Sequence, residues 1–245
     1  MKSWFKNKSF VITALVILLV VGWTAFDRYS QEGGKITAEA AVVTSYNPET
    51  QDVITNSFVQ LNVPFVSQAP LGNWDDPRQE KGCEVTSVLM ANLWLKKEGI
   101  DPRKAEKAII AGANFAIRQG YYGFNFDDAV KIMKEYHHYD KIESFGIKSI
   151  DEIKTHLKEG NIVLLPALGR RLNNPNFLPP GPPTHMIVIR GFDDRTSEFI
   201  SNDPGTTHGE NYRYPYKTIQ NAMVDYPSNH RSTKGTPKTI VVVER

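Results

Sequence analysis

The sequence predicts an α+β domain that follows one apolar N-terminal segment. Apolar residues recur with helical spacing from residue 83 to about residue 160, and strand-like apolar runs dominate from residue 162 onward. A block of helices followed by a block of strands is typical of α+β folds, whereas regular alternation indicates a parallel sheet. The chain has 245 residues, 40% of them hydrophobic, which is enough for one globular domain with a sizeable core.

The N-terminal segment predicts a membrane-spanning helix. No charge interrupts the chain from Ser9 to Phe26, and a helix of that length would run roughly 27 Å, close to the hydrocarbon thickness of a bilayer. Lys2, Lys6 and Lys8 precede it, so the N-terminus is expected inside and the rest of the chain outside the cell membrane. The alternative is a cleaved signal peptide and a secreted protein, but no small-x-small pair closes the apolar run.

These features divide the chain into three parts. Residues 1–28 form the single-pass membrane anchor or signal peptide. Residues 29–57 carry scattered charge, Gly33-Gly34 and no sustained periodicity, so they predict a linker with room for a short strand. Residues 58–245 form the globular, extracytoplasmic domain.

The helical half of the domain has clear start signals. Apolar and polar residues alternate from Phe58, which predicts a strand that ends near Gln68. The next helix begins at Cys83 and turns one apolar face to the core: Val85, Val88, Leu89, Leu93 and Trp94. Asp101-Pro102 opens another helix, and residues 125–127 open a third that runs through Met133.

In the second half of the domain, the spacing of apolar residues changes from helical to strand-like. Ser149 and Glu152 form a capping-box pattern ahead of a short helix that stops at Gly160. The predicted strands that follow span residues 162–168, 185–192, 199–202 and 238–243, and a helix over residues 216–225 lies between the last two.

Composition excludes several classes of function. The net charge of +2 is small and evenly spread, so nucleic acid is not expected as a partner. A single cysteine excludes an internal disulfide and a multi-cysteine zinc site. The chain shows no P-loop pattern and no second apolar span, so we expect no ATP, metal or other cofactor and no transporter within this chain.

The single cysteine, Cys83, stands where a polar loop becomes a helix. A helix N-terminus favours the thiolate and offers a backbone N–H to an oxyanion, so the position suits a nucleophile. A small buried hydrophobic residue is the equally weighted alternative.

A thiol nucleophile needs a base and a group that orients the base. Four histidines lie in polar or helix-end surroundings that indicate surface residues: His137, His138, His156 and His230. His185 instead directly precedes the apolar run 186–189, so it stands where a buried strand is expected to begin. A hairpin centred near residues 194–195 would bring His185 opposite residues 203–205, and Asp203 would then orient the imidazole.

Four motifs occur together in one order: Leu61–Gln68, Gly82–Ser87, His185–Asp193 and Asn202–Gly205. With these motifs the chain resembles papain-like cysteine peptidases of the bacteriocin-processing type, the double-glycine leader peptidases and their looser relatives. The resemblance spans roughly residues 61–245, essentially the whole extramembrane domain.

The resemblance implies a papain-like fold with the cysteine in a helical half and the histidine and aspartate in an antiparallel sheet half. It implies Cys83 as nucleophile, His185 as base and Asp203 as orienting acid, acting on a peptide or protein substrate. It implies Gln68 as the oxyanion residue, with Gln79 as the alternative donor. The proline-rich segment 169–184 leads directly to His185, which suggests a rim of the substrate cleft.

Three functions are compatible with these residues. A membrane-anchored cysteine peptidase is favoured. A thiol acyltransferase of the transglutaminase kind would use the same three residues, and a catalytically silent module would bind peptides without cleaving them.

Overall fold

The computed structural model describes residues 47, 49–121, 126–224 and 238–244. Within them, the strands are β1 (Val53–Ile54), β2 (Phe58–Gln60), β3 (Ile142–Ile147), β4 (Ile162–Ala167), β5 (His185–Asp193), β6 (Glu198–Asn202), β7 (Tyr212–Pro215) and β8 (Lys238–Val243). The helices are α2 (Pro77–Glu80), α3 (Cys83–Lys96), α4 (Pro102–Gln119), α5 (Phe126–Lys131), a π-helical turn (Ile132–Tyr136), α6 (Ile150–Lys158), α7 (Gly169–Leu172) and α8 (Tyr216–Ala222).

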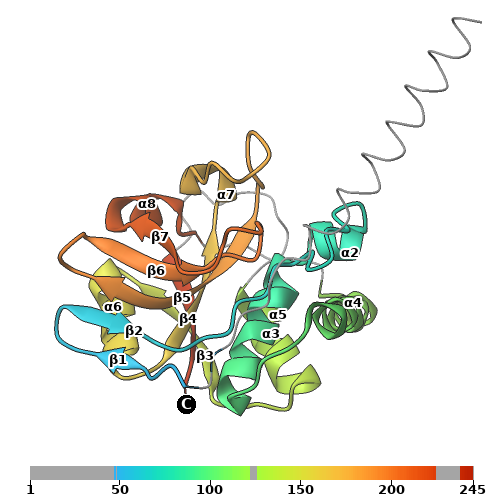
Figure 1. The fold of residues 1–245 in the computed structure, drawn as a ribbon, viewed down its shortest axis with the longest axis horizontal. Helices are drawn as coiled ribbons and strands as arrows, with labels where there is room; N and C mark the ends of the chain where they lie inside the picture. Colours follow the sequence, from blue (N-terminus) through green and yellow to red (C-terminus); the bar gives the residue numbers. More distant parts are fainter. Residues whose placement is uncertain (1–46, 48, 122–125, 225–237, 245) are drawn as a thin grey trace, which may run out of the picture. The chain divides into compact units, whose positions relative to one another are not determined.

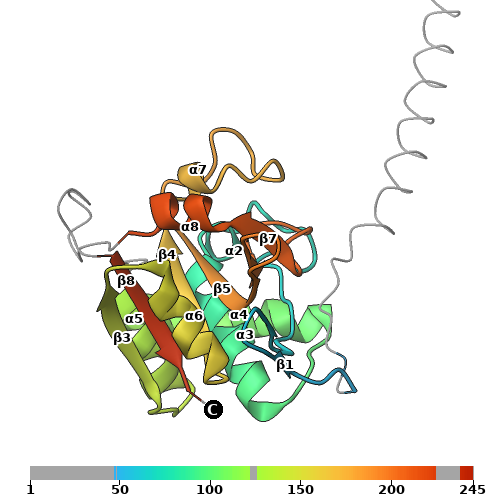
Figure 2. The same cartoon turned by 90° about the vertical axis from the view of Figure 1, so that its left-hand side faces the viewer.

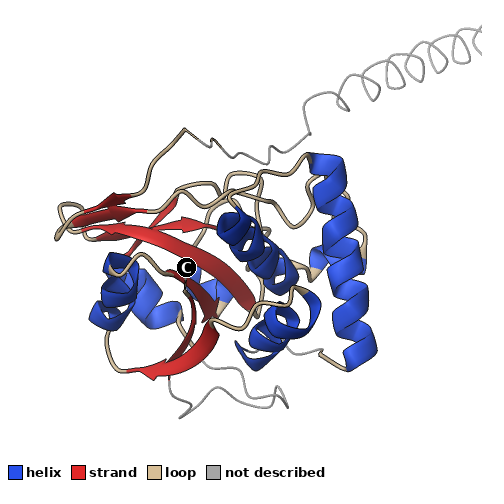
Figure 3. Ribbon diagram, turned by 90° about the horizontal axis from the view of Figure 1, so that it is seen from below, coloured by secondary structure: helices blue, strands red, loops and turns tan. Residues whose placement is uncertain are grey.

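The strands of the described residues form one antiparallel sheet. Its order is β1-β2-β5-β4-β8-β3, and β6 pairs with β5 and β7. Figure 1 shows α3, α4 and α5 on one side of this sheet and α6 on the other, and Figure 3 shows the same two groups of helices from below. The predicted combination of helices with an antiparallel sheet is therefore confirmed.

Strand β5 is the centre of the sheet. It pairs with β4 over its first half and with β2 over its second half, while β6 pairs along its opposite edge. All nine residues of β5 and all six of β4 are buried, which matches the apolar runs 186–189 and 162–167, although β5 also buries His185, Arg190 and Asp193. Figure 2 shows β4, β5 and β8 side by side, and α6 packs against β4 and β5. The strand that begins with His185 is thus fixed on both edges.

Helix α3 is enclosed on more sides than the sequence predicts. The expected single apolar face does exist, but every residue from Cys83 to Trp94 is buried. The reason is that α3 packs on β5 and is also covered by α4, α5 and the π-helical turn. A helix that is surrounded in this way holds its first residue in a fixed position.

The first predicted strand is shorter than expected. β2 ends at Gln60, although Leu61, Val63 and Phe65 are buried as the alternation indicated. Pro64 has no N–H to donate to a ladder, and the Asn202 side chain donates to the carbonyls of Val63 and Pro64 at 3.1 and 3.2 Å. The segment after β2 is therefore held by the Asn202 side chain and by separate backbone bonds, from the Leu61 N–H to Arg190 and from the Gln68 N–H to Pro204, and not by a continuous strand ladder.

The predicted membrane span and the predicted linker lie wholly or partly outside the described residues. The segment Ser9–Phe26, predicted to span the membrane, lies outside the described residues. Among the residues that are described, none of the helices combines the length and apolar character that crossing a bilayer requires. The end of the predicted linker contributes β1, the short strand for which the sequence left room.

Candidate functional site

The thiol lies where α3 meets the central strand. Cys83 is the first residue of α3 after the N-cap Gly82, and only 4% of its surface is exposed. One turn later, on the same helix face, the Ser87 hydroxyl donates a hydrogen bond of 3.3 Å to the Met186 carbonyl. Since Met186 follows His185, this contact holds the start of α3 against the start of β5.

The start of α3 also depends on its glycine. A Cβ atom on Gly82 would lie 2.8 Å from the carbonyl oxygen of Arg78 and 3.0 Å from that of Gln79. Glycine at this position therefore lets α2 end directly against the beginning of α3. Glu84 lies in the first turn of α3 and is buried there, where a negative charge is favourable to the helix.

The His185 imidazole and the Asp203 carboxylate form a buried pair. The distance from His185 Nε2 to Asp203 Oδ1 is 2.7 Å, and the two side chains are 2% and 0% exposed. The β5–β6 hairpin creates this proximity, because Val188 pairs with Asn202 and Asp203 follows at once. A bulge between Ile189 and Gly191 shifts the register. The predicted hairpin and the predicted closeness of His185 to Asp203 are confirmed.

The other ring nitrogen of His185 is the one available to the thiol. The Cys83 side chain contributes to the raised pKa of His185, and since Nε2 already bonds Asp203, Nδ1 is the nitrogen left to face the sulfur. The structure thus brings Cys83, His185 and Asp203 together in one line of contacts.

The electrostatics of the pair favour two opposite charges. Burial by itself lowers the pKa of His185, but the Asp203 charge, its hydrogen bond and the contact with Cys83 raise the pKa above the ordinary histidine value. Burial likewise raises the pKa of Asp203, while His185 and donors from Tyr214 and Gly205 outweigh it and hold that pKa below the usual range. The site therefore stabilises an imidazolium beside a carboxylate.

Gly205 leaves the room that the imidazole needs. A Cβ atom at this position would lie 2.7 Å from His185 Cε1 and 3.2 Å from the Phe177 ring. The Phe177 ring packs edge-on against His185, with 5.2 Å between the ring centroids. An aromatic ring from the 169–184 segment and a glycine from the loop after β6 therefore enclose the histidine.

The two candidate glutamines occupy different surroundings. The backbone N–H of Gln68 donates to the carbonyl of Pro204 at 2.9 Å, and its side-chain Nε2 donates to the carbonyl of Glu80 at 2.8 Å. Gln68 therefore bridges the loop beside Asp203 and the end of α2 just before Cys83. Gln79 is completely buried, and its Nε2 donates instead to Glu106 of α4 at 3.3 Å.

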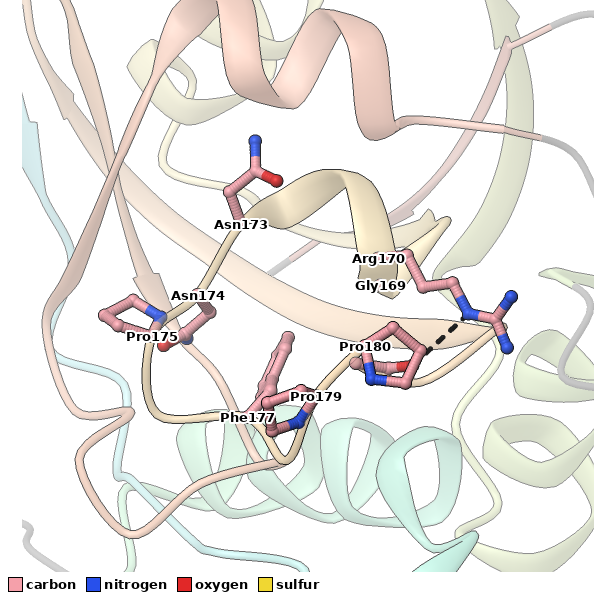
Figure 4. A pocket seen from close by; sticks show the side chains of 9 residues that line it. Gly169, Arg170, Asn173, Asn174, Pro175, Phe177, Pro179 and Pro180 are labelled. Atoms are coloured by element: carbon pink, nitrogen blue, oxygen red, sulfur yellow. Dashed lines mark hydrogen bonds between the residues drawn. The ribbon is translucent and has the colours of Figure 1, made fainter.

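The segment after β4 forms a pocket next to the buried pair. It has a volume of about 210 Å³ and is lined by residues between Gly169 and Gly181. Figure 4 shows Asn174 and Phe177 among its walls, while the Arg170 side chain extends away from them and bonds the Gly181 carbonyl. Because Phe177 contacts His185 and Asn174 contacts Asp203, one loop lines the pocket and touches the pair.

Two polar residues at the site were not predicted from the sequence. The Tyr214 hydroxyl donates to Asp203 Oδ2 at 2.6 Å, and the Asn174 amide reaches the same oxygen at 3.4 Å. Neither residue belongs to one of the four sequence motifs, and only their closeness to Asp203 in the folded chain identifies them. In the described part of the chain, no three His, Cys, Asp or Glu side chains are grouped so that they could hold a metal ion.

The solved structures that match this chain include two proteins of low sequence identity to it. A putative C39-like peptidase from Bacillus anthracis is 17% identical, with 80% of this chain and 99% of that chain covered and a TM-score of 0.45. Xylellain, a cysteine protease from Xylella fastidiosa, is 14% identical, with 84% and 97% covered and a TM-score of 0.44. A search of curated proteins found no match.

The comparison with protein families gives a clear result. The sequence pattern of the Peptidase_C39 like family matches residues 60–234, which run from the last residue of β2 through α8. The match extends over well more than half of the chain and contains Cys83, His185 and Asp203. The chain therefore belongs to the Peptidase_C39 like family of cysteine peptidases.

Proposed function

We propose that Cys83, His185 and Asp203 are the catalytic triad with which this cysteine peptidase hydrolyses peptide bonds. The observation that carries the proposal is the buried 2.7 Å pair of His185 and Asp203, together with the single cysteine at a helix N-terminus, whose side chain interacts with His185. A buried imidazole with a carboxylate on one nitrogen and a thiol on the other is arranged to exchange a proton with sulfur.

Acylation follows from the positions of the two ring nitrogens. The Cys83 thiolate attacks the carbonyl carbon of the scissile peptide bond, and the carbonyl electron pair moves to the oxygen. The proton held on His185 Nδ1 passes to the leaving amine as the carbon–nitrogen bond breaks. Asp203 stays ionised on Nε2, so it orients the ring and stabilises its positive charge.

Deacylation uses the same groups in reverse. His185, now neutral, accepts a proton at Nδ1 from a water that attacks the thioester. The acid product leaves, and the sulfur and the imidazole return to the thiolate and imidazolium forms. Hydrolysis of a peptide bond therefore requires no cofactor in this scheme.

Gln68 is our choice for the side chain of the oxyanion hole. Its amide nitrogen carries two hydrogens, of which one is used by the Glu80 carbonyl, so the second remains for a substrate oxygen. The other donor is the backbone N–H of Cys83, because the first N–H groups of a helix have no partner within it. Gln79 bonds Glu106 on α4, which gives it a structural role in joining α2 to α4.

We also propose that residues 9–26 anchor the peptidase in the cell membrane, with the catalytic domain outside. The uncharged run of membrane-spanning length and the lysines before it support this proposal. The pocket and rim of the 169–184 segment would then receive part of a peptide or protein substrate.

Alkylation of the single cysteine tests the triad. Iodoacetamide is expected to modify Cys83 rapidly even at pH values well below 8.5, about the value for a free thiol, because His185 supports the thiolate. His185→Ala should slow the reaction strongly at the same pH, whereas His208→Ala, a change at an exposed histidine, should not. Intact mass spectrometry of the full-length protein measures the rate. Alkylation that needs denaturant would identify a structural cysteine and refute the triad.

A peptide library then tests the reaction. Wild-type protein should release pairs of hydrolysed peptides and Cys83→Ala should release none, as followed by mass spectrometry. Amine cross-linking without hydrolysis would establish the acyltransferase alternative. Peptide binding without any product in both proteins would establish the silent binding module.

The two glutamines give different expectations. Gln68→Ala should lower kcat roughly 100-fold, since one oxyanion donor is lost, and should also lower the melting temperature because the bond to the Glu80 carbonyl is lost. Gln79→Ala should lower the melting temperature because it removes a buried contact between α2 and α4, and should change kcat only a few-fold. Steady-state kinetics and thermal unfolding of both variants decide between them. A large kcat loss for Gln79→Ala alone would reverse the assignment.

The buried pair should make stability depend on pH. The raised pKa of His185 adds stability that is complete below about pH 6.5, the unfolded value, and is lost as pH rises through the folded pKa. The lowered pKa of Asp203 adds stability above about pH 4 that is lost as pH falls through the folded pKa. The melting-temperature difference between the protein and its His185→Gln variant should therefore be largest between about pH 4 and 6.5.

That comparison is best made with Cys83→Ala in both proteins, so that thiol ionisation does not contribute. A difference in melting temperature that is constant with pH, or that grows above pH 7, would contradict an ion pair of His185 and Asp203.

Membrane anchoring has its own measurement. The full-length protein expressed in a bacterial host should stay in the membrane fraction after alkaline carbonate washing and dissolve in detergent. External protease should degrade its domain in spheroplasts. Recovery of a shortened protein in the medium would instead support a cleaved signal peptide.

A further inference from the structure

The Asp203 carboxylate accepts hydrogen bonds from other groups as well as from His185. Asp203 is fully buried and accepts hydrogen bonds at both carboxylate oxygens. Oδ1 accepts from His185 Nε2 at 2.7 Å and from the backbone N–H of Gly205 at 2.9 Å. Oδ2 accepts from the Tyr214 hydroxyl at 2.6 Å and lies 3.4 Å from the Asn174 amide. The second oxygen therefore depends on two side chains outside the triad.

The direction of these hydrogen bonds is fixed by their neighbours. The oxygen of the Asn174 side chain accepts from the backbone and side-chain nitrogens of Asn176 at 3.0 and 3.1 Å, so its NH₂ group must face the other way. That NH₂ group donates to the Tyr214 oxygen at 2.8 Å. Since this oxygen accepts from Asn174, the single hydroxyl hydrogen of Tyr214 is directed to Asp203. The result is a one-way chain from Asn174 through Tyr214 to Asp203.

The chain joins three separate elements. Asn174 belongs to the loop after α7 that lines the pocket in Figure 4, Tyr214 is the one buried residue of β7, and Asp203 follows β6. The Tyr214 ring is 1% exposed, and burial together with the Asp203 charge raises the pKa of its hydroxyl, so the phenol keeps its proton. Removing one donor from a buried set of hydrogen bonds whose directions are all fixed costs free energy, because a polar atom is left without its partner.

We propose that Tyr214 and Asn174 are positioning residues that hold the Asp203 carboxylate, and through it the His185 imidazole, for the reaction at Cys83. The proposal rests on the proposed function of the triad. The 169–184 loop then contributes to the charge and geometry of the catalytic pair as well as to the walls of the pocket.

Tyr214→Phe tests the proposal because it removes one hydroxyl and keeps the ring. Without this donor the Asp203 carboxylate is less stabilised, so it takes up a proton at higher pH as the solution is acidified. We expect the rate of Cys83 alkylation near neutral pH to fall roughly 10-fold. The acid limb of the rate against pH should move upward by roughly 0.5 to 1 unit. Full-length protein and intact mass spectrometry serve for both measurements.

Tyr212→Phe is the matched control. The Tyr212 ring lies 4.6 Å from that of Tyr214 on the same strand, and Asp203 receives no hydrogen bond from it among the described residues. This variant should leave the acid limb in place. If Tyr214→Phe lowers the melting temperature but leaves both the rate and the acid limb unchanged, Tyr214 is only structural and the proposal fails.

Asn174→Ala tests the order of the chain. Asn174 acts mainly through the Tyr214 oxygen, since its own distance to Asp203 is the longer one. It should move the acid limb in the same direction by a smaller amount, and the double variant with Tyr214→Phe should behave like Tyr214→Phe alone. Fully additive shifts would contradict a chain from Asn174 through Tyr214.

A separate measurement distinguishes failure of this inference from failure of the proposed function. Thermal stability at acidic pH reports the protonation of Asp203 without any thiol reactivity. If wild-type Cys83 reacts slowly, the triad fails, but Tyr214→Phe should still lose stability at a higher pH than wild type as pH falls. If wild-type Cys83 reacts rapidly and Tyr214→Phe changes neither pH profile, only the positioning role is refuted.

Discussion

The hydrogen bond between His185 Nε2 and Asp203 Oδ1 is the interaction on which the rest of the site depends. Both partners are almost completely withdrawn from water, and a buried ion pair is stable only when further hydrogen bonds satisfy its remaining polar atoms. The Gly205 backbone and the Tyr214 hydroxyl provide these bonds to Asp203. The loop after β6 and the short strand β7 therefore stabilise the charge that the histidine needs.

The helical half, through α3, and the sheet half, through β5, meet at this site. The sequence predicts those parts of the site that have strong local signals. Cys83 opens a helix because a polar loop changes there to apolar residues with helical spacing, and His185 stands directly before the apolar run 186–189 of a buried strand. The turn at residues 194–195 fixes how β5 and β6 pair, so the closeness of His185 to Asp203 follows from strand geometry. Their mutual position relative to Cys83 depends on the packing of α3 on β5, which no local pattern contains.

The remaining features depend on contacts between distant segments. β3 and β7 were not predicted because most of their residues are exposed or half-buried, so their sequences lack a clear apolar alternation. Tyr214 and Asn174 lie 11 and 29 positions from Asp203 in the chain, and neither spacing indicates a contact. The proposal of Gln68 rather than Gln79 rests on contacts that only the folded chain shows, since Gln68 bonds the Glu80 carbonyl and Gln79 bonds Glu106.

The most direct test of the account is the ultraviolet absorbance of the Cys83 thiolate as a function of pH. The sequence contains one cysteine, so the difference spectrum against Cys83→Ser isolates this sulfur. The account predicts that thiolate absorbance persists from neutral into mildly acidic solution and that His185→Gln removes it there, because the imidazolium held by Asp203 is its counter-ion. Thiolate that appears only near pH 8.5, about the ordinary value for a free cysteine, with or without His185, would contradict a catalytic pair at this site.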